Sequence, residues 1–304
     1  MPVSRAREAT AERLVPTVAP SALPKFAHSV SLLTWAYNEE QSVQAFLLRA
    51  LRMMEAAVTD FEIVFINDGS SDRTGELADA IAAADRRVRV LHNERSRNVG
   101  YCCRRAIAVA SKEYLFWQTV DWGYDLRNLR VYLELLKYYD VVQGVRESIS
   151  GPRGWLELIR GINRRSDNLR KAVVSIANFL LVRLLFGVPL SDFQNVTFYR
   201  SHFVQKLPLA SNSSFANPEM LIRSYAAGLS FIEVPIPSMR RVEGKAKGTK
   251  LFSIARSIRE IAAAWLRWGW RLRPAIRREG RCIARVAEPR GLSAEVRAIL
   301  VELK

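Results

Sequence analysis

The feature that most constrains the fold is a regular alternation of short apolar runs and longer segments with helical periodicity along the first half of the chain. A short apolar run predicts a buried strand, and apolar residues that recur every three or four positions predict an amphipathic helix. Strands are predicted at 30–34, 61–66, 88–91, 114–117 and 140–143, and helices at 41–56, 74–84, 101–110 and 126–138. Because a helix between two strands returns the chain to the same edge, the alternation predicts an α/β fold with a mostly parallel sheet flanked by helices.

The pattern changes after about residue 151. A long apolar helix is predicted at 169–186, strands at 193–199 and 230–235, and an amphipathic helix at 253–272. We therefore expect three parts, which are a flexible N-terminal arm (1–27), an α/β domain (28–250) and a basic amphipathic helix with a C-terminal tail (251–304).

The charge of the chain narrows the classes of partner. Its 304 residues contain 46 Lys and Arg against 30 Asp and Glu, which gives a net charge of +16. Such an excess calls for an anionic partner, and nucleic acid, anionic lipid headgroups and phosphorylated substrates all satisfy it. The sequence has neither zinc-finger spacing nor an aromatic ribonucleoprotein motif, so we expect no nucleic-acid partner.

The sequence also bears on cellular location, and we expect a cytoplasmic protein without a membrane span. The first 26 residues contain no continuous apolar stretch of the kind that a signal peptide needs. The longest apolar run, 172–182, is far shorter than the roughly 20 residues that cross a bilayer. The three cysteines do not form a disulfide framework, which favours reduced thiols.

Two polar clusters follow the first two predicted strands directly, where parallel sheets bind their ligands. The first is Thr34-Trp-Ala-Tyr-Asn-Glu-Glu40, whose aromatic and acidic side chains can stack on a base and accept its N–H groups. The second is Ile66-Asn-Asp-Gly-Ser-Ser-Asp-Arg-Thr74, in which a carboxylate closes a buried strand. Helix capping by Asn38 and Ser70 is an alternative explanation, so these residues alone leave both roles open.

Together, the two clusters resemble the opening of the family 2 glycosyltransferases, most nearly the branch of dolichyl-phosphate mannose synthases and undecaprenyl-phosphate sugar transferases. Tyr37-Asn-Glu39 and the second cluster match the family pattern, except that Asn67 replaces its first Asp. Arg97-Asn-Val-Gly100 matches the turn before the following helix. The resemblance implies a GT-A (Rossmann-like) domain that binds a nucleotide-sugar donor through Tyr37, Glu39, Asp68, Gly69, Ser70, Asn98 and Gly100.

A third cluster, Thr119-Val-Asp121, stands where this family carries an Asp-x-Asp motif that binds a divalent ion. The resemblance implies Mg²⁺ or Mn²⁺ at Asp121, because hard cations take oxygen ligands and neutralise the charge of a leaving diphosphate. This chain departs from the motif, since Thr119 replaces the first Asp. Asp125 is either a second metal ligand or the cap of the next helix.

Two later segments resemble the part of the same branch that surrounds the transferred sugar and the acceptor. Ser191-Asp-Phe-Gln-Asn-Val-Thr-Phe-Tyr-Arg200 implies that Asp192 and Gln194 line the sugar pocket, while Arg200 faces phosphate or solvent. Asn217-Pro-Glu219 resembles the segment whose acid faces the acceptor, although Glu219 also suits the first turn of a helix.

The segment 240–250 interleaves glycines with cations and resembles a loop that closes over phosphates in this branch. The resemblance implies phosphate or acceptor contacts from Arg240, Lys247 and Lys250, whereas a solvated basic loop is the alternative.

These resemblances imply an inverting transfer of a sugar to a polyprenyl phosphate or another lipid-linked or glycan acceptor, with Asp121, Asp192 and Glu219 as candidate catalytic residues. The basic cluster before 169–186 and the amphipathic helix after 250 favour peripheral contact with the inner face of the membrane. In the latter helix Ile254, Ile258, Ile261, Trp265 and Leu266 are predicted to share a face.

Alternatives stay open. Both helices could pack on the domain or in a homodimer, which would leave a soluble enzyme with a non-lipid acceptor. The departure at Thr119 also leaves room for a nucleotide-sugar-binding module without turnover.

Overall fold

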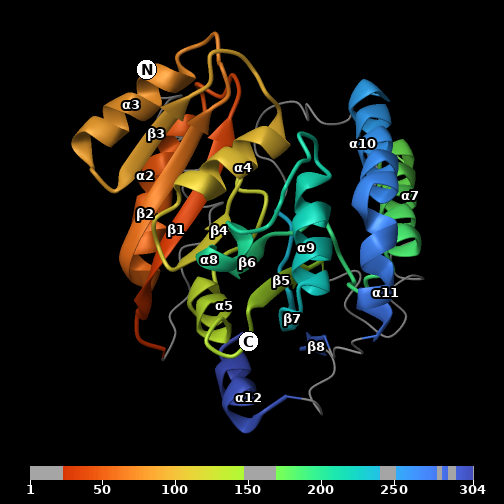
Figure 1. Cartoon of the computed structure of the whole chain (residues 1–304). Coiled ribbons are helices and arrows are strands. Elements are labelled where there is room, and N and C mark those ends of the chain that lie inside the picture. The colour runs from red at the N-terminus through yellow and green to blue at the C-terminus, as the bar shows by residue number, and fades with distance from the viewer. Residues whose placement is uncertain (1–22, 147–168, 240–250, 279–282, 287–291, 304) are drawn as a thin grey trace.

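The computed structural model describes residues 23–146, 169–239, 251–278, 283–286 and 292–303. These residues form one eight-stranded sheet with helices packed on both faces, as Figure 1 shows. The predicted α/β class is confirmed. The predicted arm lies almost entirely outside the described residues, and the first strand begins at Phe26.

The first half of the chain folds as the alternation predicts. Its elements are β1 (Phe26–Ala36), α2 (Val43–Ala57), β2 (Val58–Asn67), α3 (Thr74–Ala84), β3 (Val88–His92), α4 (Val99–Val109), β4 (Tyr114–Trp117), α5 (Leu129–Leu135) and β5 (Val141–Val145). Helix α5 is shorter than predicted, because Asp125 accepts the backbone N–H of Arg127 and holds a turn before the helix begins.

The second half is richer in helix. Its elements are α7 (Leu169–Phe186), β6 (Thr197–Arg200), α8 (Ser201–Val204), α9 (Ala216–Ala226), β7 (Phe231–Pro235), α10 (Leu251–Ala264), the π-helical turn η3 (Trp265–Gly269), α11 (Trp270–Arg278), β8 (Ala284–Arg285) and α12 (Ala294–Val301). Strand β6 begins later than predicted, because Asp192 accepts the N–H of Gln194 and turns the chain before the strand.

One strand interrupts an otherwise parallel sheet. The strand order is β3-β2-β1-β4-β6-β5-β7-β8, and β6 runs antiparallel to both of its neighbours. The remaining neighbouring strands are parallel to each other. The carboxyl ends of β1, β2 and β4 therefore meet at one edge of the sheet, where α/β folds bind their ligands.

Both faces of the sheet are buried, which explains the near-continuous apolar strands. In β2, Ile63 and Phe65 point to the face covered by α2, α5 and α12, whereas Val64 and Ile66 point to the face covered by α4 and α9. A strand buried on both sides does not alternate between apolar and polar residues. The sequence pattern and the packing thus have the same cause.

Helix α7 lies beside α10, and both stand outside α9 (Figure 1). The ring of Phe186 contacts Trp265 and Trp268, at centroid distances of 5.8 and 5.2 Å. Gly269 makes this packing possible, because a Cβ there would lie 2.5 Å from the Phe186 ring. Trp265 and Trp268, in the turn that follows α10, therefore pack α7 against the last long helix.

The predicted apolar face of the last long helix is buried only in part. Ile261 is buried and Trp265 is half-buried, whereas Ile258 and Leu266 are exposed, Leu266 by 74%. Positions three, four and seven residues apart lie on one side of a helix, so Ile258 neighbours Ile261 and Trp265, and the rest of the fold covers only part of this face. The side chain of Ile254 lies outside the described residues.

The end of the chain returns to the sheet. Strand β8 pairs with β7, and α12 contacts α5. Within the described part of the chain, no helix combines the length and the apolar character needed to cross a membrane.

Candidate functional site

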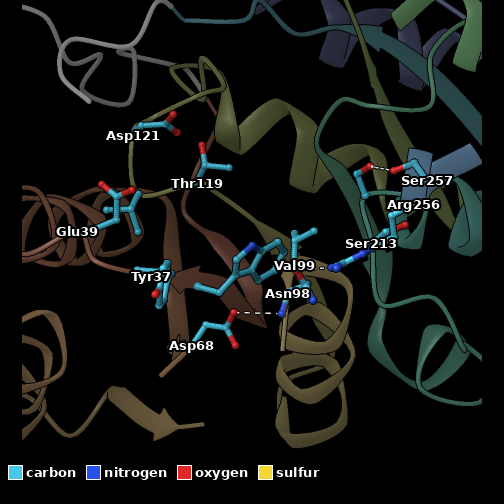
Figure 2. Close-up of a pocket in the computed structure, with 14 residues that line it drawn as sticks. Tyr37, Glu39, Asp68, Asn98, Val99, Thr119, Asp121, Ser213, Arg256 and Ser257 are labelled. Atoms are coloured by element: carbon cyan, nitrogen blue, oxygen red, sulfur yellow. Dashed lines mark hydrogen bonds between the residues drawn. The ribbon is translucent and has the colours of Figure 1, made fainter. Parts of the chain in front are cut away.

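A pocket of about 440 Å³ opens at the carboxyl ends of β1, β2 and β4. One wall is formed by residues that follow these strands, and the opposite wall by the 213–214 loop and α10, as Figure 2 shows. Five residues predicted from the sequence line this pocket, and these are Tyr37, Glu39, Asp68, Asn98 and Asp121.

Strained backbone surrounds the same pocket. Among the described residues, the non-glycine residues with positive φ are Asn38 (53°), Asn98 (71°) and Trp122 (51°). Each lies in or next to a segment that lines the pocket. Such conformations cost about 1–3 kcal/mol each and concentrate at functional sites, where the surroundings over-determine them. Their clustering supports function independently of any sequence motif.

Asn38 clamps the segment after β1 to the turn after β2. Its backbone N–H donates to Ser70 Oγ at 3.0 Å, and its Oδ1 accepts the N–H of Ser71 at 2.9 Å. Asn38 is not a helix cap, since α2 begins at Val43 with Ser42 before it. The predicted residue Ser70 therefore acts on the pocket by fixing this backbone.

The same clamp sets the direction of Tyr37 and Glu39. The N–H of Glu39 donates to Thr74 Oγ1 at 2.8 Å, which fixes its backbone against the start of α3. The side chains of Tyr37 and Glu39 line the pocket, and Tyr37 is 41% exposed. An open aromatic ring next to a carboxylate is suited to a nucleoside.

Asp68 is buried and holds the loop that follows β3. Its Oδ1 accepts from Asn93 Nδ2 at 2.7 Å and from the N–H of Arg97 at 2.8 Å. Its Oδ2 accepts from Ser96 Oγ at 2.8 Å and from the N–H of Asn98 at 3.1 Å. Since a carboxylate has about four acceptor sites, Asp68 shapes the pocket by ordering this loop. Its contact with a base or ribose stays a prediction.

Gly69 and Gly100 allow close backbone contacts next to the pocket. Gly69 has φ of 69°, and a Cβ there would lie 2.5 Å from the carbonyl carbon of Arg95. A Cβ on Gly100 would lie 2.6 Å from the carbonyl carbon of Asn212, whose oxygen accepts the N–H of Gly100 at 3.2 Å. Both glycines therefore bring neighbouring loops together, and neither belongs to the pocket lining.

The segment after β4 presents one carboxylate to the pocket. Asp121 lines the pocket beside Thr119, whose Oγ1 accepts the backbone N–H of Gly123 at 2.9 Å. Asp125 is buried against Arg127, with 2.7 Å between Oδ2 and Nη2, and it does not line the pocket. The structure thus brings Asp121 to the pocket and leaves Asp125 in its own turn.

These residues suit a divalent ion that is shared with a phosphorylated ligand. The described residues contain no cluster of three His, Cys, Asp or Glu side chains that could hold a metal alone. Mg²⁺ is commonly bound by one or two carboxylates, with substrate phosphates and water completing its shell. Asp121 lines the pocket, as Figure 2 shows, so a single carboxylate that shares the ion with a diphosphate fits this mode.

Asp192 and Gln194 lie outside the lining of the pocket. The buried Asp192 carboxylate forms a two-pronged ion pair with Arg146, with 2.7 Å from Oδ2 to Nε and 3.0 Å from Oδ1 to Nη2. Nearby, burial raises the pKa of Tyr124 to about 12, so its phenol stays protonated at neutral pH. Asp192 is therefore neutralised by Arg146, which follows β5, and neither Asp192 nor Gln194 reaches the pocket described above.

Glu219 is also buried and outside the pocket lining. Its Oε2 accepts the N–H groups of Ala210 and Ser211 at 3.0 and 2.8 Å, and its Oε1 accepts from Arg223 Nε at 3.0 Å. It stands in the first turn of α9, as the alternative explanation expects. In this arrangement Glu219 anchors the loop before α9.

Arg200 lies at the opposite edge of the sheet. It pairs in register with Tyr114, the first residue of β4, and its Nη2 donates to the carbonyl oxygen of Leu136 at 3.1 Å. The structure does not bring it near the pocket. The other predicted phosphate contacts, Arg240, Lys247 and Lys250, lie outside the described residues.

Sequence reasoning missed the wall formed by α10. Arg256 and Ser257 line the pocket, and Arg256 Nη1 donates to Asn98 Oδ1 at 2.8 Å. Ser257 Oγ lies 2.9 Å from Ser214 Oγ, which also lines the pocket. One helix turn further, Glu260 accepts from Ser211 and Ser213.

The missed residues carry a weak sequence signal. Arg256, Ser257 and Glu260 occupy polar positions that the helical periodicity assigns to solvent. Only the serine-rich stretch 211–214, which offers several hydroxyl partners, hints that a polar helix face packs there.

The fold and the pocket together define a class of protein. A mostly parallel sheet, with an aromatic and carboxylate-lined pocket at the carboxyl ends of its first strands, is typical of α/β proteins that bind nucleotides. The model of the family described as Glycosyl transferase family 2 matches residues 31–193, which is more than half of the chain. The chain belongs to this family of glycosyltransferases.

Curated relatives agree with this assignment. The chain is 29% identical over 273 residues to the glycosyltransferase AglD of Haloferax volcanii, a match that covers 87% of this chain but only 41% of that protein. It is 25% identical over 218 residues to the undecaprenyl-phosphate mannosyltransferase of Micrococcus luteus, covering 69% of this chain and 84% of that protein.

Solved structures show the same fold. Glucosyl-3-phosphoglycerate synthase from Mycobacterium tuberculosis superposes with a TM-score of 0.55 at 17% identity, covering 79% of both chains. At this level of identity the likeness concerns the fold alone.

Proposed function

We propose that this protein transfers a sugar, with inversion, from a nucleotide diphosphate sugar to a phosphorylated acceptor, a polyprenyl phosphate in first place. The observation that carries the proposal is the pocket in which Tyr37, Glu39 and Asp121 meet at the carboxyl ends of β1 and β4. The family assignment supports the transferase chemistry.

In this proposal the strand ends hold the donor. Tyr37 stacks on the base, Glu39 accepts hydrogen bonds from the nucleoside, and Asn98 contributes from the start of α4. Asp121 would hold Mg²⁺ or Mn²⁺ with the diphosphate, where the ion neutralises negative charge on the leaving group. A complex of the synthase from Mycobacterium tuberculosis with Mn²⁺ and UDP, at a TM-score of 0.54, supports this arrangement.

The side chains outside the pocket favour an acceptor that is already anionic. A neutral hydroxyl acceptor needs a base to remove its proton as it attacks. Asp192 is paired with Arg146, and Glu219 is bonded to Arg223 and two backbone N–H groups. Since a phosphate monoester needs no deprotonation, a phosphorylated acceptor agrees with carboxylates that are engaged in this way.

Exposed apolar side chains on α7 and in the turn and helix after α10 support contact with a membrane. Leu180 and Leu184 of α7 are 56% and 71% exposed, and Leu266 and Trp270 after α10 are 74% and 52% exposed. Exposed arginines share these helices, and they are Arg183, Arg259, Arg267 and Arg271. Apolar side chains flanked by cations are typical of surfaces that bind anionic bilayers. A peripheral site at the inner face of the membrane follows as part of the proposal.

The donor half of the proposal is tested by thermal shift with UDP, GDP and their sugars, each with and without Mn²⁺ or Mg²⁺. We expect one nucleotide diphosphate to raise Tm in a metal-dependent way, and Asp121→Asn to remove the metal-dependent part. A chain that no nucleotide stabilises would contradict the proposal. Stabilisation without turnover on any acceptor would instead indicate a binding module.

The acceptor half is tested with undecaprenyl phosphate and, as a water-soluble alternative, 3-phosphoglycerate. The second acceptor is suggested by the complex of the Mycobacterium tuberculosis synthase with phosphoglyceric acid. We expect transfer to the lipid phosphate, and NMR of the product should show the anomeric configuration opposite to that of the donor. Retention of configuration would contradict the proposed mechanism.

The membrane contact is tested by flotation with vesicles that contain anionic lipid. Leu266→Glu should weaken binding, because it places a like charge on the face that meets the bilayer. Leu48→Glu, at a position on α2 that is 39% exposed, is the matched control and should bind as the unchanged protein does. Equal binding of both variants would remove this part of the proposal.

A further inference from the structure

We propose that Arg256 of α10 binds the diphosphate of the donor and supplies the positive charge at the pocket wall opposite Asp121. The inference rests on the proposed function and assigns a donor-binding role to a helix that lies outside the residues matched by the family model. It makes α10 part of the nucleotide site.

The first support is the position of Arg256. Its side chain lines the pocket, and its Nη1 donates to Asn98 Oδ1 at 2.8 Å, as Figure 2 shows. Asn98 directly precedes α4, whose amino end carries a partial positive charge. The guanidinium therefore meets the amino end of a helix at the pocket, and two sources of positive potential converge there.

The second support is the charge of the pocket. Among the described residues that line it, the charged ones are Glu39, Asp68, Asp121 and Arg256. Three carboxylates would repel a diphosphate unless cations offset them. A divalent ion at Asp121 supplies part of this charge, and Arg256 supplies charge from the facing wall. A planar guanidinium is well suited to phosphate because it donates two parallel hydrogen bonds.

The third support is the replacement of an acid by Thr119. The Thr119 hydroxyl lines the pocket but already accepts the N–H of Gly123. An ion at Asp121 thus has one anionic ligand fewer from this turn than in a complete Asp-x-Asp motif. A site with fewer anionic ligands holds a divalent ion less tightly, so at low metal concentration a cationic side chain of the protein has a larger share in binding the diphosphate.

The fourth support is the way α10 is held. Ser257 contacts Ser214 at 2.9 Å, and Glu260 accepts from Ser213 Oγ at 2.7 Å. These polar contacts fix the rotation of α10 about its axis. Arg256 is consequently presented to the pocket by a docked helix and oriented by Asn98.

The test is calorimetric titration of the full chain with UDP and GDP, in Mn²⁺ and in EDTA. Arg256→Gln should weaken binding of the accepted diphosphate by about 10- to 100-fold, the effect of losing charge-assisted hydrogen bonds. Arg256→Lys should recover part of the loss, because Lys restores the charge without the planar fork. Arg297→Gln, at an exposed arginine on α12, is the control and should change Kd less than twofold.

Binding of the corresponding nucleosides distinguishes a phosphate-binding role of Arg256 from a purely structural one. Uridine and guanosine lack phosphate, so Arg256→Gln should leave their thermal shifts unchanged if the pocket keeps its shape. Asn98→Gly is a second variant, since glycine adopts the φ of 71° and removes only the side-chain acceptor. It should weaken the diphosphate less than Arg256→Gln does.

The outcomes are distinct. Wild-type protein that binds UDP or GDP, with Arg256→Gln binding it equally well, would overturn this inference and leave the proposed function intact. Equal weakening of nucleoside and diphosphate would overturn it as well, since Arg256 would then only support the pocket. Wild-type protein that binds neither diphosphate would overturn the proposed function itself.

Discussion

The two walls of the pocket are built in different ways. The inner wall consists of segments that leave neighbouring parallel strands and bond directly to one another, as Asp68 does with four donors of the loop after β3. The opposite wall consists of α10 and the 211–214 loop, which meet through serine hydroxyls and Glu260. The shape and the carboxylates of the nucleotide side are thus fixed when the sheet folds, whereas the positive charge of Arg256 reaches the pocket only when α10 docks.

The largest effect is expected at the inner wall. Asp121→Asn should lower sugar transfer by about 100- to 1,000-fold, because it removes the carboxylate that would hold the divalent ion at the leaving diphosphate. The measurement is the rate of transfer or donor hydrolysis at saturating Mn²⁺.

The matched control for this change is Asp125→Asn. Asp125 is buried against Arg127 outside the pocket, so its loss should lower Tm but leave donor affinity within about threefold. If both variants lost activity equally, the distinction between the two carboxylates would be refuted.

The next largest effect concerns how much the hydrogen bonds of the inner wall contribute to the stability of the fold. Asp68→Ala should lower the free energy of unfolding by about 3 kcal/mol, because it leaves buried donors of one loop without their acceptor. Urea unfolding measures this loss. Asp79→Ala on the exposed side of α3 serves as the comparison and should cost about 0.5 kcal/mol or less.

At the opposite wall, a substitution should affect donor affinity more than the free energy of unfolding. Glu260→Ala should weaken donor binding by about tenfold, because it frees α10 from the 211–213 loop and displaces the pocket wall. Its effect on global unfolding should be small, since α10 still packs on α7. Hydrogen exchange of α10 is the direct measurement, and Glu295→Ala on α12 is the control.

If Glu260→Ala lowered the free energy of unfolding as much as Asp68→Ala does, the two walls would not differ in stability. In that case α10 would belong to the same cooperative unit as the sheet.

The smallest effect is the pH dependence of the stability that a carboxylate of β2 contributes. Burial opposes ionisation of Glu62, but hydrogen bonds from Ser111, Ser31 and Arg89 hold its pKa below the ordinary value of 4.5. The stability due to this carboxylate is therefore complete above about pH 4.5 and is lost as the pH falls through the lowered pKa. Glu62→Gln should make the urea midpoint depend less on pH below about pH 4.5, and an unchanged pH dependence in this range would contradict this origin.

The contrast between the walls also explains what the sequence could predict. Strand ends are marked by apolar runs that stop at polar residues, so the pattern alone assigns Tyr37, Glu39 and Asp121 to one edge of the sheet, and all three line the pocket there. Helix α10 has no such marker. Whether Arg256 faces solvent or a pocket depends on the rotation of a helix that tertiary contacts set, and periodicity alone assigns it to solvent.

Roles within the correctly placed segments were harder to predict than positions. Gly100 and Ser70 lie beside the pocket, but both act on backbone geometry. Glu219 fits the acceptor motif by sequence, yet its hydrogen bonds anchor a loop. A residue type shows which bonds are possible, and only the fold decides which partner is within reach.

The antiparallel strand β6 has a consequence for how the chain is made. Strand β4, with the sequence Tyr114-Leu-Phe-Trp117, pairs with β1 on one side and has β6 on the other. During synthesis this second edge stays open until Thr197 to Arg200 have left the ribosome, and an unpaired apolar edge invites association between chains. A fragment cut at the end of the family match, residue 193, would keep that edge open permanently and should aggregate more readily than one that extends through β6 and β7.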